Sequence, residues 1–161
     1  MVDITSFKGC MSNFTTGITI ITTLNQRSQK IGVTINSFNS VSLDPLLILF
    51  SLKKSSYCYD ELSHARYFTV NILSTDQQEL VQLFTKPGEN KWQNLEFYSQ
   101  ETRTPSPAIK GCLAFLECEH FAAYEGGDHT IIVGKVMNLY NDPHTTQPLI
   151  YFKGTFKSLT D

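Results

Sequence analysis

Apolar residues in this chain recur mostly in short, β-branched or alternating runs that turn-forming residues separate. The run Ile18–Thr23 consists only of Ile and Thr, which favours a strand over a helix. Asn25–Gln29 follows as a turn, and the Gly126–Gly127 pair marks a hairpin between two longer apolar runs. On these patterns we expect strands over residues 18–23, 30–36, 46–52, 67–73, 112–124, 129–140, 149–152 and 155–159.

Three short segments have apolar residues at helical spacing instead. We expect helices over the first dozen residues, over 57–64 and over 77–84. Ser55 or Ser56 would cap the second of these helices, and Ser74–Asp76 the third. Residues 85–107 show neither the helical nor the strand spacing of apolar residues. Loops of this length inside a compact domain are usually functional or mobile.

The order of these elements predicts a mainly β fold, an antiparallel barrel that is closed or partly closed and carries a few short helices. A parallel sheet would need a crossover helix between most successive strands, whereas turns join most of them here. The chain length of 161 residues fits a single domain that spans residues 1–161.

Composition and charge narrow the function classes. The chain is 41% apolar and 17% charged, with a net charge of −2, as in ordinary globular proteins. Its longest basic run is the pair Lys53–Lys54, so we expect no nucleic-acid binding. The N-terminus lacks the features of a secretory signal, and no apolar run approaches the ~20 residues that cross a bilayer. We therefore expect a cytoplasmic protein that does not bind membranes.

Cysteine spacing and nucleotide motifs give further exclusions. The four cysteines form no CxxC pair, which favours free buried thiols over a disulfide frame or a metal site. The chain has no dinucleotide-binding GxGxxG motif and no phosphate-binding P-loop motif. Any nucleotide cofactor must therefore bind by another arrangement.

A polar segment between two apolar strands carries the first candidate chemistry. Short hydroxyl and amide side chains crowd residues 36–42, and the apolar run Leu46–Leu52 follows directly after Pro45. Polar groups wedged between core strands are costly unless something hydrogen-bonds to them. A flat ligand rich in donors and acceptors, such as a flavin ring, would supply those bonds. An ordinary connection between strands explains the same residues equally well.

The segment Lys53–Ser56 is a candidate phosphate site. It follows the strand over residues 46–52 and opens the helix over residues 57–64, so backbone N–H groups, hydroxyls and lysine side chains come together. Solvated lysines beside a capped helix are the simpler alternative. Because the strand spans about 20 Å, we expect one extended ligand to lie along it, with its ring at residues 36–42 and its phosphate at the opposite end.

Single polar residues within or beside apolar elements mark further candidates. Asn71 lies inside an apolar strand and Gln77 begins the next helix, so each needs a partner, either a ligand or the backbone. Phe84 would close over a pocket or fill the core. His129, beside Asp128 at the hairpin tip, would shuttle a proton or orient a substrate amide, although a solvated turn histidine is the commoner case. No GxSxG motif supports a Ser–His–Asp hydrolase.

Taken together, five motifs in this order resemble the flavin reductase family, which has the FMN-binding split-barrel fold and supplies the reductase components of two-component flavin monooxygenases. The motifs are Thr16–Thr22, Asn36–Pro45, Phe68–Leu73 with Gln77, Gly127–Thr130 and Pro148–Gly154. The resemblance covers nearly the whole chain. It has two departures: a single proline follows Asp44 where the family commonly has two, and residues 86–107 match no family pattern.

The resemblance implies roles for individual residues. Contacts with the flavin ring and ribityl chain would come from Asn36, Ser37, Phe38, Asn39, Ser40 and Ser42, and contacts with its phosphate from Lys54, Ser55 and Ser56. The flavin site would be completed by Asn71, Ile72, Leu73, Gln77 and Phe84. The residue implied at the catalytic face, where the nicotinamide stacks, is His129, with Asp128 and Tyr151 nearby as substrate-binding residues.

The function implied by the resemblance is that of an NAD(P)H:flavin oxidoreductase. Hydride would pass from NADH or NADPH to bound FMN, with FAD as an alternative, and the reduced flavin would serve a partner monooxygenase. The resemblance also implies a homodimer, with residues 85–107 as a candidate to cross to the partner subunit. Two other classes stay open: a non-catalytic protein that stores or senses FMN, and a ligand-free β-barrel interaction module.

Overall fold

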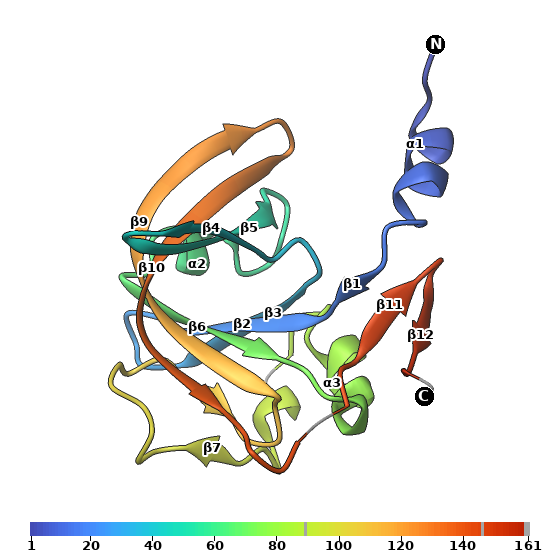
Figure 1. Ribbon diagram of the computed structural model, residues 1–161. Coiled ribbons are helices and arrows are strands. Elements are labelled where there is room, and N and C mark those ends of the chain that lie inside the picture. Colours follow the sequence, from blue (N-terminus) through green and yellow to red (C-terminus); the bar gives the residue numbers. More distant parts are fainter. Residues whose placement is uncertain (89, 146, 160–161) are drawn as a thin grey trace.

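The computed structural model describes residues 1–88, 90–145 and 147–159. Residues 89, 146 and 160–161 lie outside the described part, although the predicted domain includes all of them and the predicted loop 85–107 includes the first. The described chain forms a β-rich body from which the N-terminal helix projects (Figure 1).

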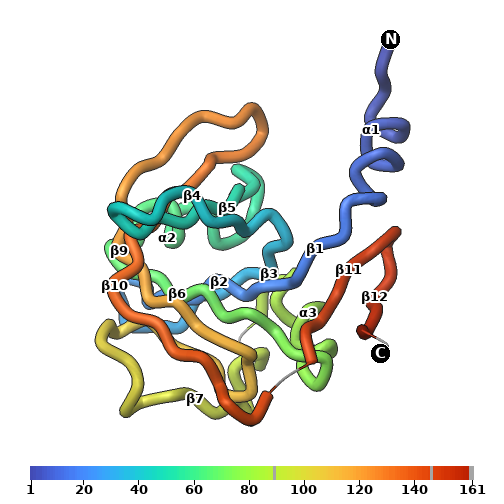
Figure 2. The backbone as a smooth tube through the Cα atoms, in the orientation of Figure 1, coloured from blue at the N-terminus to red at the C-terminus, as the bar shows by residue number. Residues whose placement is uncertain are grey.

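The body is built on a seven-stranded sheet in the order β3-β2-β6-β9-β10-β5-β4. Every pair of neighbours in this sheet is antiparallel. Its strands are β2 (Thr19–Leu24), β3 (Lys30–Ile35), β4 (Asn39–Leu43), β5 (Leu46–Lys53), β6 (Tyr67–Ile72), β9 (Ala114–Gly126) and β10 (His129–Asn141). The chain leaves β3 at one edge and crosses to β4 at the other, so the sheet curls into a split barrel (Figure 2). The predicted mainly β, antiparallel split-barrel fold is confirmed.

Smaller elements lie at the margins of the barrel. Two further sheets contain β1 (Thr16–Gly17), β11 (Ile150–Phe152) and β12 (Thr155–Lys157), and β7 (Phe97–Tyr98) with β8 (Ala108–Ile109). The helices are α1 (Ile4–Met11), α2 (Tyr59–Ser63) and α3 (Gln78–Leu83), with 3-10 turns η1 (Thr75–Gln77) and η2 (Asn90–Trp92). None of the described helices is long and apolar enough to span a membrane.

Two local predictions are wrong. The expected strands leave out residues 39–43, whereas β4 begins at Asn39 and pairs with β5. The second helix begins at Tyr59, with Cys58 rather than Ser55 or Ser56 at its N-cap. Ser74 caps the 3-10 turn η1 that leads into the third helix and forms a capping box with Gln77, whereas the N-cap of α3 itself is Gln77.

Two apolar clusters lie on opposite faces of β2. Phe50 and Phe68 belong to the first, inside the barrel, while Phe84 belongs to the second, beneath α3. Ile21 of β2 enters the first cluster and Ile20 the second. Because both faces of β2 are buried, its sequence shows no alternation of apolar and charged residues.

Buried polar side chains fasten residues 103–106 to the barrel. Glu117 on β9 is fully buried, and its carboxylate accepts hydrogen bonds from the backbone N–H groups of Arg103 and Thr104, each at 2.7 Å. The Thr69 hydroxyl donates to the carbonyl of Ser106 at 3.3 Å. These contacts fix the end of the irregular segment against β6 and β9 of its own chain.

A buried lysine holds the earlier part of the same segment. Lys91 is 6% exposed, and its Nζ donates to Tyr57 Oη and to the carbonyl of Lys86, each at 2.6 Å. Tyr57 in turn donates to the carbonyl of Gly32 on β3. Burial lowers the pKa of Lys91, because a charged ammonium loses its hydration there. The segment therefore packs directly behind β3.

The close approach of β9 and β10 to the interior aromatic ring of Phe68 requires a glycine at Gly134. A Cβ added to Gly134 would overlap the Phe68 ring and lie 3.0 Å from the Cβ of Cys118. We expect Gly134→Ala to lower the free energy of unfolding by about 1–3 kcal/mol through overpacking. Denaturant unfolding would measure this. Gly9→Ala is the matched control, because a Cβ at Gly9 meets nothing within 4 Å; equal losses in both variants would contradict the packing argument.

Candidate functional site

A cavity of about 240 Å³ opens where the ends of β3 and β5 meet the β9–β10 hairpin. Backbone and side chains from three distant stretches of sequence line it: Val33, Thr34, Ile35, Asn36, Ser37, Ser51, Leu52, Lys53, Ser56 and His129. Four of the predicted site residues, Asn36, Ser37, Ser56 and His129, therefore come together at one place.

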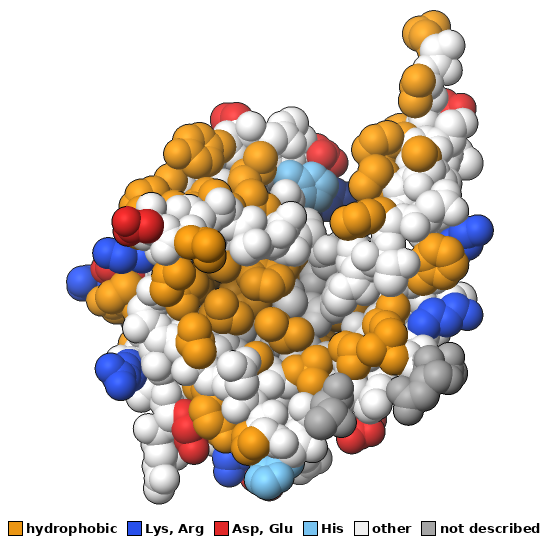
Figure 3. Space-filling view, viewed as in Figure 1, with side chains coloured by type: hydrophobic (Ala, Val, Ile, Leu, Met, Phe, Trp, Pro, Cys, Tyr) orange, Lys and Arg blue, Asp and Glu red, His pale blue; other side chains and the backbone are white. Residues whose placement is uncertain are grey.

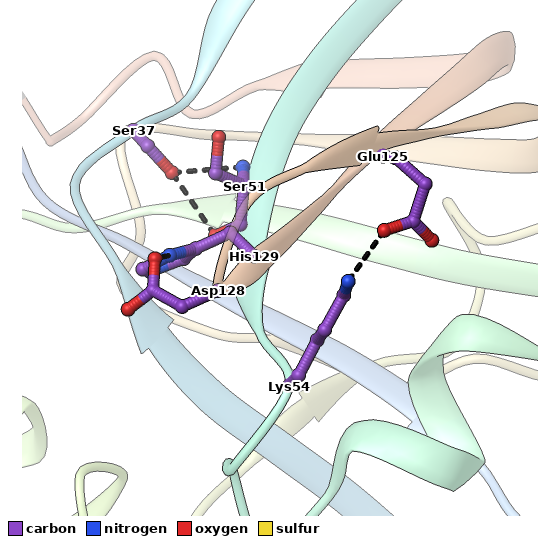
Figure 4. Close-up of polar contacts among 6 residues, drawn as sticks. All are labelled: Ser37, Ser51, Lys54, Glu125, Asp128 and His129. Carbon is purple, nitrogen blue, oxygen red and sulfur yellow. Dashed lines mark hydrogen bonds and ion pairs between the residues drawn. The ribbon is translucent and has the colours of Figure 1, made fainter.

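Ser37 joins the segment after β3 to β5. Its Oγ accepts a hydrogen bond from the N–H of Ser51 at 2.9 Å and donates to the carbonyl of Ser51 at 3.3 Å (Figure 4). From there β4 runs back along β5, and Leu43 pairs with Leu46 at the far end. Ser37 therefore lies near the same end of β5 as Lys53. The expectation that the polar segment and the lysines lie at opposite ends of this strand is wrong for the start of the segment, because β4 reverses the chain before β5.

The two lysines after β5 have different surroundings. Lys53 lines the cavity, whereas Lys54 makes an ion pair with Glu125 on the hairpin (Figure 4). The hydrogen bond to Glu125 raises the pKa of Lys54. The residues implied by the resemblance include Lys54 and omit Lys53. Lys53 is the last residue of β5 and Lys54 begins the turn that follows, so no local sequence signal shows which of the two lysines faces the cavity.

His129 begins β10 and reaches the cavity from the hairpin. It pairs with Lys53 across the ladder between β10 and β5. Its Nδ1 lies 2.8 Å from Oδ1 of Asp128, and this contact lowers the pKa of the Asp128 carboxyl. Asp128 itself does not line the cavity. Asp128 lies next to His129, as predicted. Its side chain is exposed and orients the imidazole.

Two neighbouring hollows continue the site on the other side of Asn36. The first, about 270 Å³, is lined by Phe14, Thr15, Thr16, Gly17, Thr19, Asn36, Phe38, Asn39 and Ile72. The second, about 490 Å³, shares Phe38, Asn39 and Ile72 with it and adds Ser40 and apolar residues of β5, β9 and β10. Asn36 lines both the first hollow and the cavity at Lys53. Three neighbouring depressions that share wall residues therefore extend from Ser56 past Asn36 to Ser40.

The structure places several predicted residues away from these depressions. The side chains of Leu73 and Phe84 are buried in the apolar cluster beneath α3. Ser42 accepts a hydrogen bond from the N–H of Asp44, Ser55 is exposed in the turn after β5, and Tyr151 pairs with Thr16 in the β1–β11 ladder. The Tyr151 side chain packs on the cluster beneath α3 and against Phe156, and its strand belongs to a different sheet from that of His129.

Asn71 and Gln77 have partners within the chain. The Asn71 amide donates to the carbonyl of Ile20 at 3.0 Å, and its Oδ1 accepts from the N–H of Ile109 at 2.8 Å. Gln77 Nε2 donates to the carbonyl of Lys110 at 2.8 Å. The sequence left open whether a ligand or the backbone is the partner of these side chains, and the structure shows backbone partners for both. Both residues hold the chain around β8 against the barrel.

Comparison with known proteins connects this site to a family. Residues 11–160 match the family described as the flavin reductase like domain. The chain belongs to this family. Its similarity to members extends over almost the whole chain and includes the segments that line the cavity at Lys53.

Three relatives illustrate the range of similarity. FMN reductase (NADH) SmoA of Agrobacterium fabrum is 40% identical over 94% of this chain and 83% of its own length. The reductase component of the flavin-dependent trigonelline monooxygenase of Acinetobacter baylyi is 33% identical over 98% of this chain, which spans about half (51%) of that protein. The NADH:FAD oxidoreductase SgcE6 of Streptomyces globisporus, solved with NAD and FAD fragments, is 29% identical and superposes with a TM-score of 0.89 over 98% of this chain and 93% of its own.

The residues around Asn36 fit the flavin that the family name implies. Thr16 Oγ1 is buried without a hydrogen-bond partner among the described residues, and it borders the first hollow. Asn36 and Asn39 are exposed in the same hollow, so their amides can meet the polar edge of a ring. Lys53, in the neighbouring cavity, supplies the positive charge that a phosphate requires.

The internal hydrogen bonds of Asn71 predict a structural role. We expect Asn71→Ala to lower the free energy of unfolding by about 1–3 kcal/mol, because the N–H of Ile109 loses its acceptor in a buried place. Asn36→Ala is the matched control, since Asn36 is exposed, and its unfolding free energy should stay within about 0.5 kcal/mol of the wild type. Denaturant unfolding of both variants would measure the difference. Equal stability of the two variants would remove Asn71 from this role.

Proposed function

We propose that this chain is an NAD(P)H:flavin oxidoreductase that transfers hydride from a nicotinamide to bound FMN, with FAD as the alternative flavin, and supplies reduced flavin to a partner monooxygenase. The observation that carries the proposal is the set of neighbouring depressions on both sides of Asn36. It combines amide and hydroxyl groups at one end with Lys53 and Ser56 at the other. The names of the relatives in Agrobacterium and Acinetobacter support the same reaction. A cytoplasmic location is part of this proposal, because nicotinamide nucleotides are found there.

The protein supplies binding and orientation, while a bound flavin supplies the redox chemistry by accepting hydride. Asn36, Asn39 and Ser40 would hold the polar edge of the ring, and Phe38 its apolar surface. Lys53 and Ser56 would hold the phosphate, with Lys54 and Ser55 in the same turn. Packing a ring against Phe38 excludes water from one face, which favours a close approach of the second ring on the other face.

His129 would orient the hydride donor. The Asp128 carboxylate accepts from Nδ1–H of the imidazole, which leaves Nε2 to contact the carboxamide of a nicotinamide. The imidazole lines the cavity from the hairpin, opposite Ser37 and Ser51. In this role the residue positions a substrate and does not act as a nucleophile.

A flavin-dependent NADH oxidation assay tests the proposal, with NADPH as a parallel donor. We expect oxidation of the donor to require added FMN or FAD, and we expect His129→Ala to raise KM for NADH about 10-fold with a change below about 2-fold in the Kd for FMN, because one hydrogen bond to a bound substrate is lost. Tight FMN binding without turnover would support the non-catalytic, FMN-storing alternative instead. A larger effect of His129→Ala on FMN than on NADH would place the nicotinamide elsewhere.

We further propose that the chain forms a homodimer, with α1 packing on a second copy. Helix α1 projects from the body, and none of its residues is buried (Figure 1). Phe7 is 59% exposed and Phe14 is 70% exposed, and orange apolar side chains cover much of the face that the projecting helix borders (Figure 3). Leu43, Met137 and Leu139 on β4 and β10 are also exposed. Exposed apolar areas of this kind mark interaction surfaces, and a second copy offers the complementary face by symmetry.

Sedimentation velocity would test the dimer. We expect the wild type to sediment as a dimer and Phe7→Asp to shift it towards monomer by at least about 10-fold in dissociation constant, because a charge would be buried at the interface. Lys8→Asp introduces the same side chain at the neighbouring position of α1 and should leave the dimer intact. A monomeric wild type would overturn the proposal, as would equal dissociation of both variants.

A further inference from the structure

Glu125 lies on β9 beside the hairpin tip, outside every residue assigned above to the flavin. Its carboxylate pairs with the ammonium of Lys54 (Figure 4). A second contact joins the turn after β5 to the hairpin, because the N–H of Lys54 donates to the carbonyl of Asp128 at 3.0 Å. The turn that follows β5 is therefore joined to the hairpin by one backbone contact and one side-chain contact.

The side-chain contact can be broken at low cost. The Glu125 side chain is 82% exposed and that of Lys54 is 38% exposed. Exposed ion pairs contribute little to stability, since water and salt screen both charges. The backbone contact through Asp128 does not depend on the ion pair, so the hairpin keeps its place when Lys54 moves.

Lys54 pairs with Glu125 and does not line the cavity, but it follows Lys53 directly in the chain, so a flavin phosphate bound at Lys53 would compete with Glu125 for the Lys54 ammonium. Lys54 belongs to the same turn as Lys53 and Ser56, which line the cavity. A phosphate at those two residues carries more negative charge than a carboxylate and offers more acceptor oxygens, so it forms stronger charge-assisted hydrogen bonds with a lysine. The single ammonium group of Lys54 cannot form a full ion pair with the Glu125 carboxylate and with the phosphate at the same time.

We propose that Glu125 sets the affinity of this site for phosphate-bearing flavins by competing for Lys54. The inference rests on the proposed flavin-binding function. Glu125 pairs with Lys54, and a flavin phosphate that binds Lys54 must displace it. This displacement weakens the binding of FMN and FAD, which carry phosphate. It does not affect the binding of riboflavin, which carries none. A site weakened in this way releases FMN more readily, as a protein that hands reduced flavin to another enzyme requires.

Fluorescence titration of FMN and riboflavin with Glu125→Gln tests this proposal. We expect the Kd for FMN to fall by about 2- to 5-fold, since the competing charge of an exposed pair is removed. The Kd for riboflavin should change by less than about 1.5-fold, because no phosphate contacts Lys54. In Lys54→Met, the added Glu125→Gln change should have no effect on FMN, because the two residues act through one contact.

Glu119→Gln is the matched control. Glu119 lies on the same strand and pairs with Arg66 at 3.4 Å, so its replacement changes the net charge equally while leaving Lys54 paired. If Glu119→Gln and Glu125→Gln lowered the Kd for FMN equally, the effect would come from the change in net charge and not from the contact with Lys54. That result would overturn the inference. Tightening of riboflavin to the same extent as FMN would also overturn it. A wild type that binds neither flavin would instead overturn the proposed function, so the two failures are distinguishable.

Discussion

The pair of hydrogen bonds between Ser37 and Ser51 is the constraint on which the site depends. The chain leaves β3 at one edge of the sheet and must reach β4 at the other. The Ser37 hydroxyl meets both the N–H and the carbonyl of Ser51, so the crossing segment is held at the end of β5 near Lys53. The open edge of the barrel thereby becomes a lined cavity, because the backbone groups of Ser51 that face the crossing segment find their partner in a side chain.

Buried polar side chains elsewhere shape the outer part of the molecule. Glu117, Asn71 and Gln77 each make at least one hydrogen bond to the backbone of residues 103–110. Each bond satisfies a buried donor or acceptor and at the same time fixes a stretch that has little regular structure of its own. Residues on β9 and β6 therefore hold the end of the segment that the sequence leaves without a pattern, and residues on β6 and in the turn before α3 hold the chain just after it.

Much of the fold follows from local sequence, and the site follows only in part. The β-branched run of β2 and the Gly126–Gly127 turn indicate strands and a hairpin directly, and the structure has both. The short strand β4 escapes this reasoning, since its Asn and Ser residues favour a turn and only pairing with β5 makes it a strand. Asn71 illustrates what the sequence leaves undecided about the site. A polar residue in an apolar strand indicates that a partner exists, but whether the partner is a ligand or the N–H of Ile109 depends on tertiary contacts.

The structure of the FMN complex is the most direct test of this account, because it shows where the flavin lies. The account predicts the ring against Asn36 and Phe38, with the phosphate beside Lys53 and Ser56. An alternative cavity of about 760 Å³ lies between the β2–β3 turn and α2 and is lined by Arg27 and His64 among others. Flavin bound in that cavity, with the depressions around Asn36 left to solvent, would contradict the account.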